Sequence, residues 1–101
     1  MSYSFQSINF NADDKLIYLI NKRTNKLKLF FNKIISIQVF AKVENNSTKI
    51  NKHIELILNI PGEQFIVKKT SFSFEGALSK VSSSVERRLK NHKQKLRIKS
   101  A

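Results

Sequence analysis

The last turns of the chain carry the side chains best suited to bind an anion. After Glu86, seven lysines and arginines follow without a further acid. Apolar residues recur through this stretch at steps of three, four and seven, which predicts an amphipathic helix with one stripe in a core. That stripe consists of Phe74, Leu78, Val81, Val85, Leu89 and Leu96. The opposite side of the helix is then free to contact a polyanion.

A second group of cations falls on an earlier helix, expected from Asp14 to about Lys33. On a helical wheel at ~100° per residue, four of its lysines share an arc of about 40° opposite Ile20 and Leu27. Together the two helices offer these candidate RNA-binding residues: Lys15, Lys22, Arg23, Lys26, Lys33, Lys80, Arg87, Arg88, Lys90, Lys93 and Lys95.

The whole chain shares this excess of positive charge. Its 101 residues include 19 Lys and Arg against seven Asp and Glu, a formal charge of +12. Such a charge predicts attraction to nucleic acid, anionic lipid or an acidic protein. Three interpretations stay open: an RNA-binding surface, a basic module that meets an acidic protein, and ordinary solvated helix faces. The second helix favours RNA, because a merely solvated face would interleave acids with its lysines.

The sequence argues against an enzyme. It contains no cysteine, no Gly-rich phosphate loop and no close carboxylate pair except Asp13 and Asp14, which we assign to helix capping. Two isolated histidines cannot form a zinc site, and His92 falls on the apolar stripe beside Leu96, where a packing role is expected. We therefore expect no metal, no cofactor and no small-molecule substrate.

Length and hydropathy predict one soluble domain over residues 1–101, with a short basic tail from about residue 97. The first residues lack the pattern of a signal peptide, and no apolar run approaches the ~20 residues of a membrane span. A cytoplasmic, monomeric protein without membrane contact is expected.

Hydrophobic periodicity predicts the order strand, helix, three strands, helix. Asn11 or Asp13 should cap the first helix, Pro61-Gly62 should close a hairpin, and Ser73 should cap the last helix. The expected strands run over 3–9, 35–43, 53–60 and 64–70. Two amphipathic helices on one face of a four-stranded, mostly antiparallel sheet give a two-layer α+β sandwich of β-α-β-β-β-α order. The other face would expose a mixed surface that includes Phe40 and Ile57.

Three segments resemble those of ribosome hibernation promoting factors, also called ribosome-associated inhibitors or the ribosomal subunit interface family. They are Asn25 to Ile34, Val39 to Glu44, and Arg87 to Leu96. The resemblance covers nearly the whole chain. It implies a fold related in layout to double-stranded RNA-binding domains.

The resemblance also implies a function. Members bind 16S rRNA in the decoding region of the small (30S) ribosomal subunit, block mRNA and tRNA, and silence translation in stationary phase or stress. Carried over by position, the rRNA-facing residues correspond to Lys22, Arg23, Lys26, Arg87, Lys90, Lys93 and Lys95. A generic module for structured RNA is the alternative within RNA binding.

The chain departs from the family pattern at three places. Ser73-Phe74-Glu75 replaces an Asp-Met-Tyr helix start, Ser83-Ser84 replaces Asp-Lys, and Asn91 stands where lysine is usual. Because the chain stops soon after Leu96, it resembles the short form of the family. Whether it promotes ribosome dimers or only inactive single ribosomes stays open.

Overall fold

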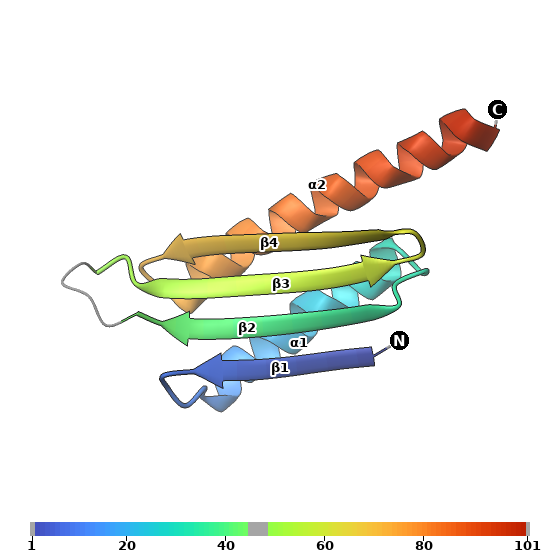
Figure 1. Ribbon diagram of the computed structural model, residues 1–101. Coiled ribbons are helices and arrows are strands. Elements are labelled where there is room, and N and C mark those ends of the chain that lie inside the picture. The colour runs from blue at the N-terminus through green and yellow to red at the C-terminus, as the bar shows by residue number, and fades with distance from the viewer. Residues whose placement is uncertain (1, 45–48, 101) are drawn as a thin grey trace.

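The structure is a computed structural model, and it describes residues 2–44 and 49–100, with side chains to residue 95. Its elements follow the predicted order, with two helices behind one face of a four-stranded sheet (Figure 1). They are β1 (Ser2–Ile8), α1 (Asp14–Phe30), β2 (Ser36–Val43), β3 (Lys52–Ile60), β4 (Glu63–Ser71) and α2 (Phe74–Ser100). The predicted two-layer α+β class is confirmed.

The strands lie in the order β1-β2-β3-β4. β1 pairs with β2 in parallel, as the α1 crossover requires, while β2 with β3 and β3 with β4 are antiparallel. Pro61 and Gly62 close the β3–β4 hairpin, where Gly62 has a φ of 80° that glycine adopts without strain. The expected hairpin is therefore confirmed.

α1 begins where the sequence predicted and ends earlier. The Asp13 side chain accepts a 2.8 Å hydrogen bond from the Leu16 N–H, so Asp13 rather than Asn11 is the cap. The helix stops at Phe30, because Phe31 turns to an extended conformation and buries its ring in the core. Lys33 therefore lies in the turn that follows, and its predicted place on the helical ridge is wrong.

α2 is anchored through most of the predicted stripe. Leu78, Val81, Val85 and Leu89 are all at most 2% exposed, and the Ser73 hydroxyl caps the helix at the Gly76 N–H, 3.0 Å away. Phe74 stacks on Phe10 with ring centroids 4.6 Å apart. The side chain of Leu96, predicted for the core, lies outside the described ones. In Figure 1 the last turns of α2 project beyond the sheet.

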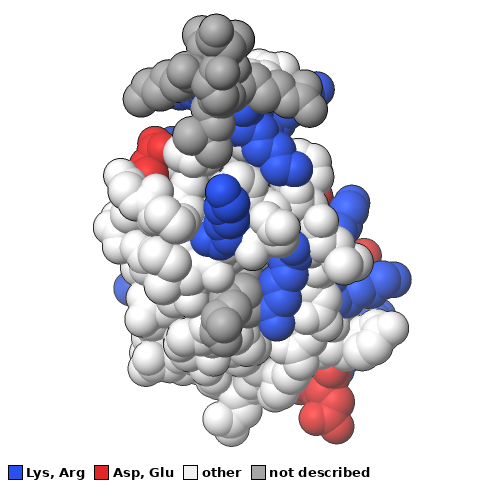
Figure 2. All heavy atoms as spheres, turned by 90° about the vertical axis from the view of Figure 1, so that its right-hand side faces the viewer, with Lys and Arg blue, Asp and Glu red and all other residues white. Residues whose placement is uncertain are grey.

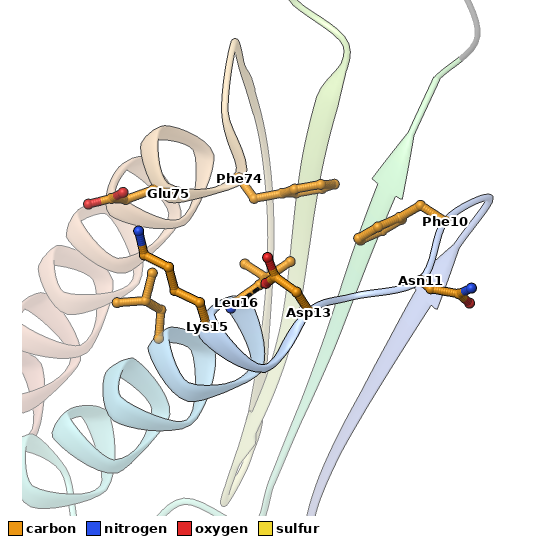
Figure 3. Close-up of a pocket in the computed structure, with 8 residues that line it drawn as sticks. Phe10, Asn11, Asp13, Lys15, Leu16, Phe74 and Glu75 are labelled. Atoms are coloured by element: carbon orange, nitrogen blue, oxygen red, sulfur yellow. Dashed lines mark hydrogen bonds between the residues drawn. The ribbon is translucent and has the colours of Figure 1, made fainter.

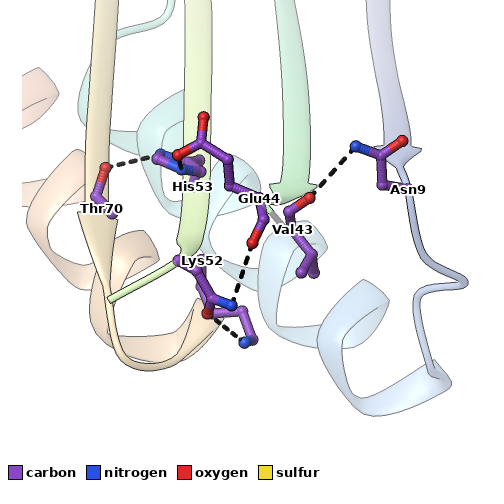
Figure 4. A network of polar contacts seen from close by, with 7 residues as sticks. Asn9, Val43, Glu44, Lys52, His53 and Thr70 are labelled. Atoms are coloured by element: carbon purple, nitrogen blue, oxygen red, sulfur yellow. Dashed lines mark hydrogen bonds and ion pairs between the residues drawn. The ribbon is translucent and has the colours of Figure 1, made fainter. Parts of the chain in front are cut away.

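The sheet face away from the helices is polar with scattered apolar side chains. Phe40 and Ile57 are half-buried there, and Ile66 is exposed. At the end where β2 stops and β3 starts, His53 bonds to Glu44 and to Thr70, at 3.1 and 2.8 Å (Figure 4). Among the described residues, no helix has the length and apolar character needed to cross a membrane.

Candidate nucleic-acid interface

Two cations of α1 contact α2 where the helices pack together. The Lys26 ammonium lies 3.5 Å from the Glu86 carboxylate, and the Arg23 guanidinium donates a 3.3 Å hydrogen bond to the Ser79 hydroxyl. Lys22 is exposed one helical turn before Lys26. These contacts fix Arg23 and Lys26 at the helix junction, where Glu86 offsets part of the Lys26 charge.

The junction continues to the end of α1. The Lys93 ammonium donates to the carbonyl of Phe30, the last residue of that helix, and lies 4.6 Å from the centre of the Phe30 ring. A cation at this position also offsets the partial negative charge at a helix C-terminus. Lys90 lines the same hollow as Phe30 and Lys93. Lys90 and Lys93 therefore belong to the α1 side of α2.

Another pair of the predicted cations faces the sheet edge. Lys80 and Arg87 line a hollow of about 380 Å³ along β4, and the Lys80 ammonium lies 3.4 Å from the Thr70 carbonyl oxygen. Lys69 of β4 lines this hollow too, and the sequence analysis missed it. The sequence signal for Lys69 was its position on the same face of the strand as the buried Phe65 and Val67. A long lysine side chain there can reach outward past the core.

Arg88 and Lys95 lie over the β3–β4 hairpin. They line a hollow with His92 and Glu63, whose ring nitrogen and carboxylate oxygen are 2.9 Å apart. The His92 ring also packs edge-on against Phe31 and Phe65. The predicted packing role of His92 is thus confirmed, and Glu63 lowers the net positive charge of this group.

Lys15 and Lys33 lie at opposite ends of α1. Lys15, in the first turn, lines a pocket beside the stacked Phe10 and Phe74, and its side chain points toward Glu75 (Figure 3). Lys33 is exposed beyond the other end of the helix. Of the four lysines predicted to form one ridge, only Lys22 and Lys26 therefore lie together near the helix junction.

The charges at the end of the molecule where α1 stops favour contact with a polyanion. Figure 2 shows the end of the molecule at which α1 stops and the hairpin turns, with Lys and Arg spread over the face and acids at its margin. No cluster of three His, Cys, Asp or Glu that could hold a metal ion occurs among the described residues. Charge neutralisation and hydrogen bonding are what this arrangement offers chemically.

Fold and site together define a small α+β domain with a cationic helical layer. The chain belongs to the family described as Sigma 54 modulation protein / S30EA ribosomal protein, whose model matches residues 3–97. The family resemblance drawn from the sequence is confirmed.

A named relative is similar in sequence, and two solved structures are similar in fold. The ribosome hibernation promoting factor of Pseudomonas putida is 30% identical over 78 residues, which cover 77% of this chain and 72% of the relative. A ribosomal subunit interface protein from Coxiella burnetii has a similar fold, with a TM-score of 0.81 at 15% identity, covering 93% of this chain and 99% of that one. The Thermus thermophilus Protein Y N-terminal domain gives a TM-score of 0.72 at 13% identity, covering 90% and 94%.

Proposed function

We propose that this protein is a non-catalytic ribosome hibernation factor of the cytoplasm. It binds the small ribosomal subunit near the decoding region, and its bulk excludes mRNA and tRNA, which inactivates translation in stationary phase or stress. One domain does this, by stoichiometric occupancy. The observation that carries the proposal is the group of cations that α1 and α2 place around their junction, in a chain of this family.

The contacts of the site rank its residues for this role. Lys22, Arg23 and Lys26 on α1, with Lys90 and Lys93 on α2, form the central part that meets 16S rRNA phosphates. Lys80 and Arg87 extend it along the β4 edge with Lys69, and Arg88 and Lys95 extend it over the hairpin. Lys15 and Lys33 contribute least, because they lie away from the helix junction.

Sedimentation with purified small subunits tests this function. Arg23 and Lys26 contact α2, so their replacement would also change contacts between the helices. A cleaner variant is Lys22→Gln with Arg87→Gln and Lys90→Gln. All three side chains are exposed. We expect this variant to remain in the unbound fraction at physiological salt, because it loses three phosphate contacts.

The matched control removes equal charge from other exposed positions. Lys28→Gln with Lys49→Gln and Lys68→Gln should sediment with small subunits as the wild type does, since Lys68 is on the sheet face opposite the helices. Equal loss in both variants would mean that net charge, and not this site, drives binding. Competition with a free RNA duplex separates a generic RNA module, which would bind both partners equally well.

A further inference from the structure

The outer side of α1 exposes large apolar side chains among its cations. Tyr18 is 63% and Leu29 is 89% exposed, although an amphipathic helix usually presents polar residues to solvent. Isolated exposed apolar residues are common on protein surfaces. The surroundings of these two residues therefore decide whether they have a role.

Tyr18 and Leu29 belong to one hollow of about 540 Å³ along the outside of α1. Its described lining contains no acidic side chain and combines one aromatic ring, two asparagines and three cations. The residues are Tyr18, Leu19, Asn21, Lys22, Arg23, Asn25, Lys26 and Leu29. They recur at steps of three and four, so they form one continuous strip of the helix surface.

This combination matches a nucleotide better than a bare phosphate chain. An aromatic ring stacks on an unpaired base, asparagine amides donate to and accept from base edges, and lysines neutralise the attached phosphate. A duplex backbone would use the cations and leave the ring and Leu29 in water. An acidic peptide would satisfy the cations but would offer no flat base to stack on the Tyr18 ring.

We propose that the outer hollow of α1 binds an unpaired RNA nucleotide, with its base stacked on Tyr18 and its phosphate against Lys22. This inference deepens the proposed function and rests on it for the role of α1 in RNA contact. It adds base recognition to an interface that charge alone would make insensitive to bases. Asn21 lies one helical turn from Tyr18, within reach of the base edge, and Asn25 and Leu29 continue the strip beyond this nucleotide.

Tyrosine fluorescence gives a direct readout of stacking. The chain has two tyrosines and no tryptophan, so in a Tyr3→Phe background Tyr18 is the sole emitter of this kind. We expect a single-stranded oligoadenylate to quench Tyr18 emission in a saturable way. Inorganic polyphosphate should displace the oligoadenylate without quenching. Equal quenching by polyphosphate, or oligoadenylate binding without quenching, would overturn the proposal.

Affinity for the same oligoadenylate provides a second test. Tyr18→Ala should weaken binding about tenfold and Tyr18→Phe less than about twofold, since stacking depends on the ring. The matched control is Phe72→Ala, which removes another exposed ring, 68% exposed, and should leave affinity unchanged. Circular dichroism and urea midpoints check that each variant is folded. An unchanged affinity of folded Tyr18→Ala contradicts the inference.

Sedimentation with small subunits separates this inference from the proposed function. If the wild type co-sediments and folded Tyr18→Ala binds oligoadenylate like the wild type, the function stands and the nucleotide site falls. If the wild type does not co-sediment while oligoadenylate quenches Tyr18, the ribosomal function falls and the nucleotide site stands.

Discussion

The two helices cover the same sheet and differ in what they bury and what they expose. α2 buries Ala77, Leu78, Val81, Val85 and Leu89 at 2% exposure or less, and every exposed residue of α2 between 74 and 95 is polar or charged. α1 buries Leu16, Ile20 and Leu27 with the small polar Thr24, and it exposes Tyr18 and Leu29.

This difference indicates a division of labour. α2 combines the main apolar anchor of the helical layer with a field of cations, so its outer side contributes charge. α1 contributes Lys22, Arg23 and Lys26 at the helix junction and adds groups that can contact a base. Binding strength and base recognition should therefore respond to different substitutions.

The salt dependence of binding to small subunits should show the largest effect. It tests whether α2 supplies charge while α1 supplies base contacts. If about six phosphates are neutralised, affinity for small subunits falls on the order of a thousandfold between 50 and 200 mM salt. Replacing Arg87, Arg88 and Lys90 with glutamine should lower the slope of log affinity against log salt by about half. Tyr18→Ala should leave the slope unchanged. Sedimentation across a salt series measures both, and an equal slope for all three proteins contradicts the division.

Stability should separate the buried from the exposed leucines. Leu89 is 0% exposed in α2, so Leu89→Ala removes packed methyl groups and leaves a cavity, which lowers the free energy of unfolding by about 3 kcal/mol. Leu29→Ala on α1 should change it by less than about 0.5 kcal/mol. Urea unfolding followed by circular dichroism makes the measurement. A large loss from Leu29→Ala would place this residue in a packed contact and undermine its assignment to an open hollow.

The ion pair between the helices should contribute little. Lys26 and Glu86 have side chains 64% and 32% exposed, and a pair of this exposure couples by about 0.5 kcal/mol. A double-mutant cycle with Lys26→Gln and Glu86→Gln measures this coupling. The expected result leaves Lys26 free to exchange Glu86 for an rRNA phosphate. Coupling well above 1 kcal/mol would instead make the pair a structural element of the junction.

Alkaline pH should reveal the smallest effect. Burial raises the pKa of Tyr3 above its ordinary value of 10.0. The folded state therefore holds this proton more tightly, and its contribution to stability is present below pH 10 and lost as pH rises through the folded pKa. Urea unfolding should show a steeper alkaline decline for the wild type than for Tyr3→Phe. If the stability of both proteins declined in parallel, the Tyr3 hydroxyl would not be buried. The Tyr18 fluorescence test, which uses the Tyr3→Phe background, would be unaffected.

The sequence predicted the elements because most of them carry local signals. Asp13 and Ser73 cap the helices as their types predict, and Pro61-Gly62 turns the chain where its chemistry allows. The end of α1 had no such signal. Neither Gly nor Pro follows Phe30, and the helix stops because the Phe31 ring is drawn into the core, which is a tertiary effect.

The sequence identified candidate cations but not their arrangement. A helical wheel identifies exposed lysines and cannot say which neighbour each will contact. Lys93 reaches the end of α1, whereas Lys80 and Arg87 meet Lys69 at the sheet edge. These groupings depend on the crossing of two helices over a twisted sheet. Tyr18 was visible in the sequence, but its role requires the hollow around it.

The placement of cations along α2 has a consequence for how the protein approaches its partner. Lys90, Lys93 and Lys95 lie toward the far end of a helix of 27 residues, in a molecule 52 Å long and 24 by 18 Å across. Positive charge displaced from the centre of mass gives the molecule an electric dipole moment. The field of a polyanion exerts a torque on this dipole that turns the cationic end of α2 forward before contact, so a larger share of collisions begins in a productive orientation.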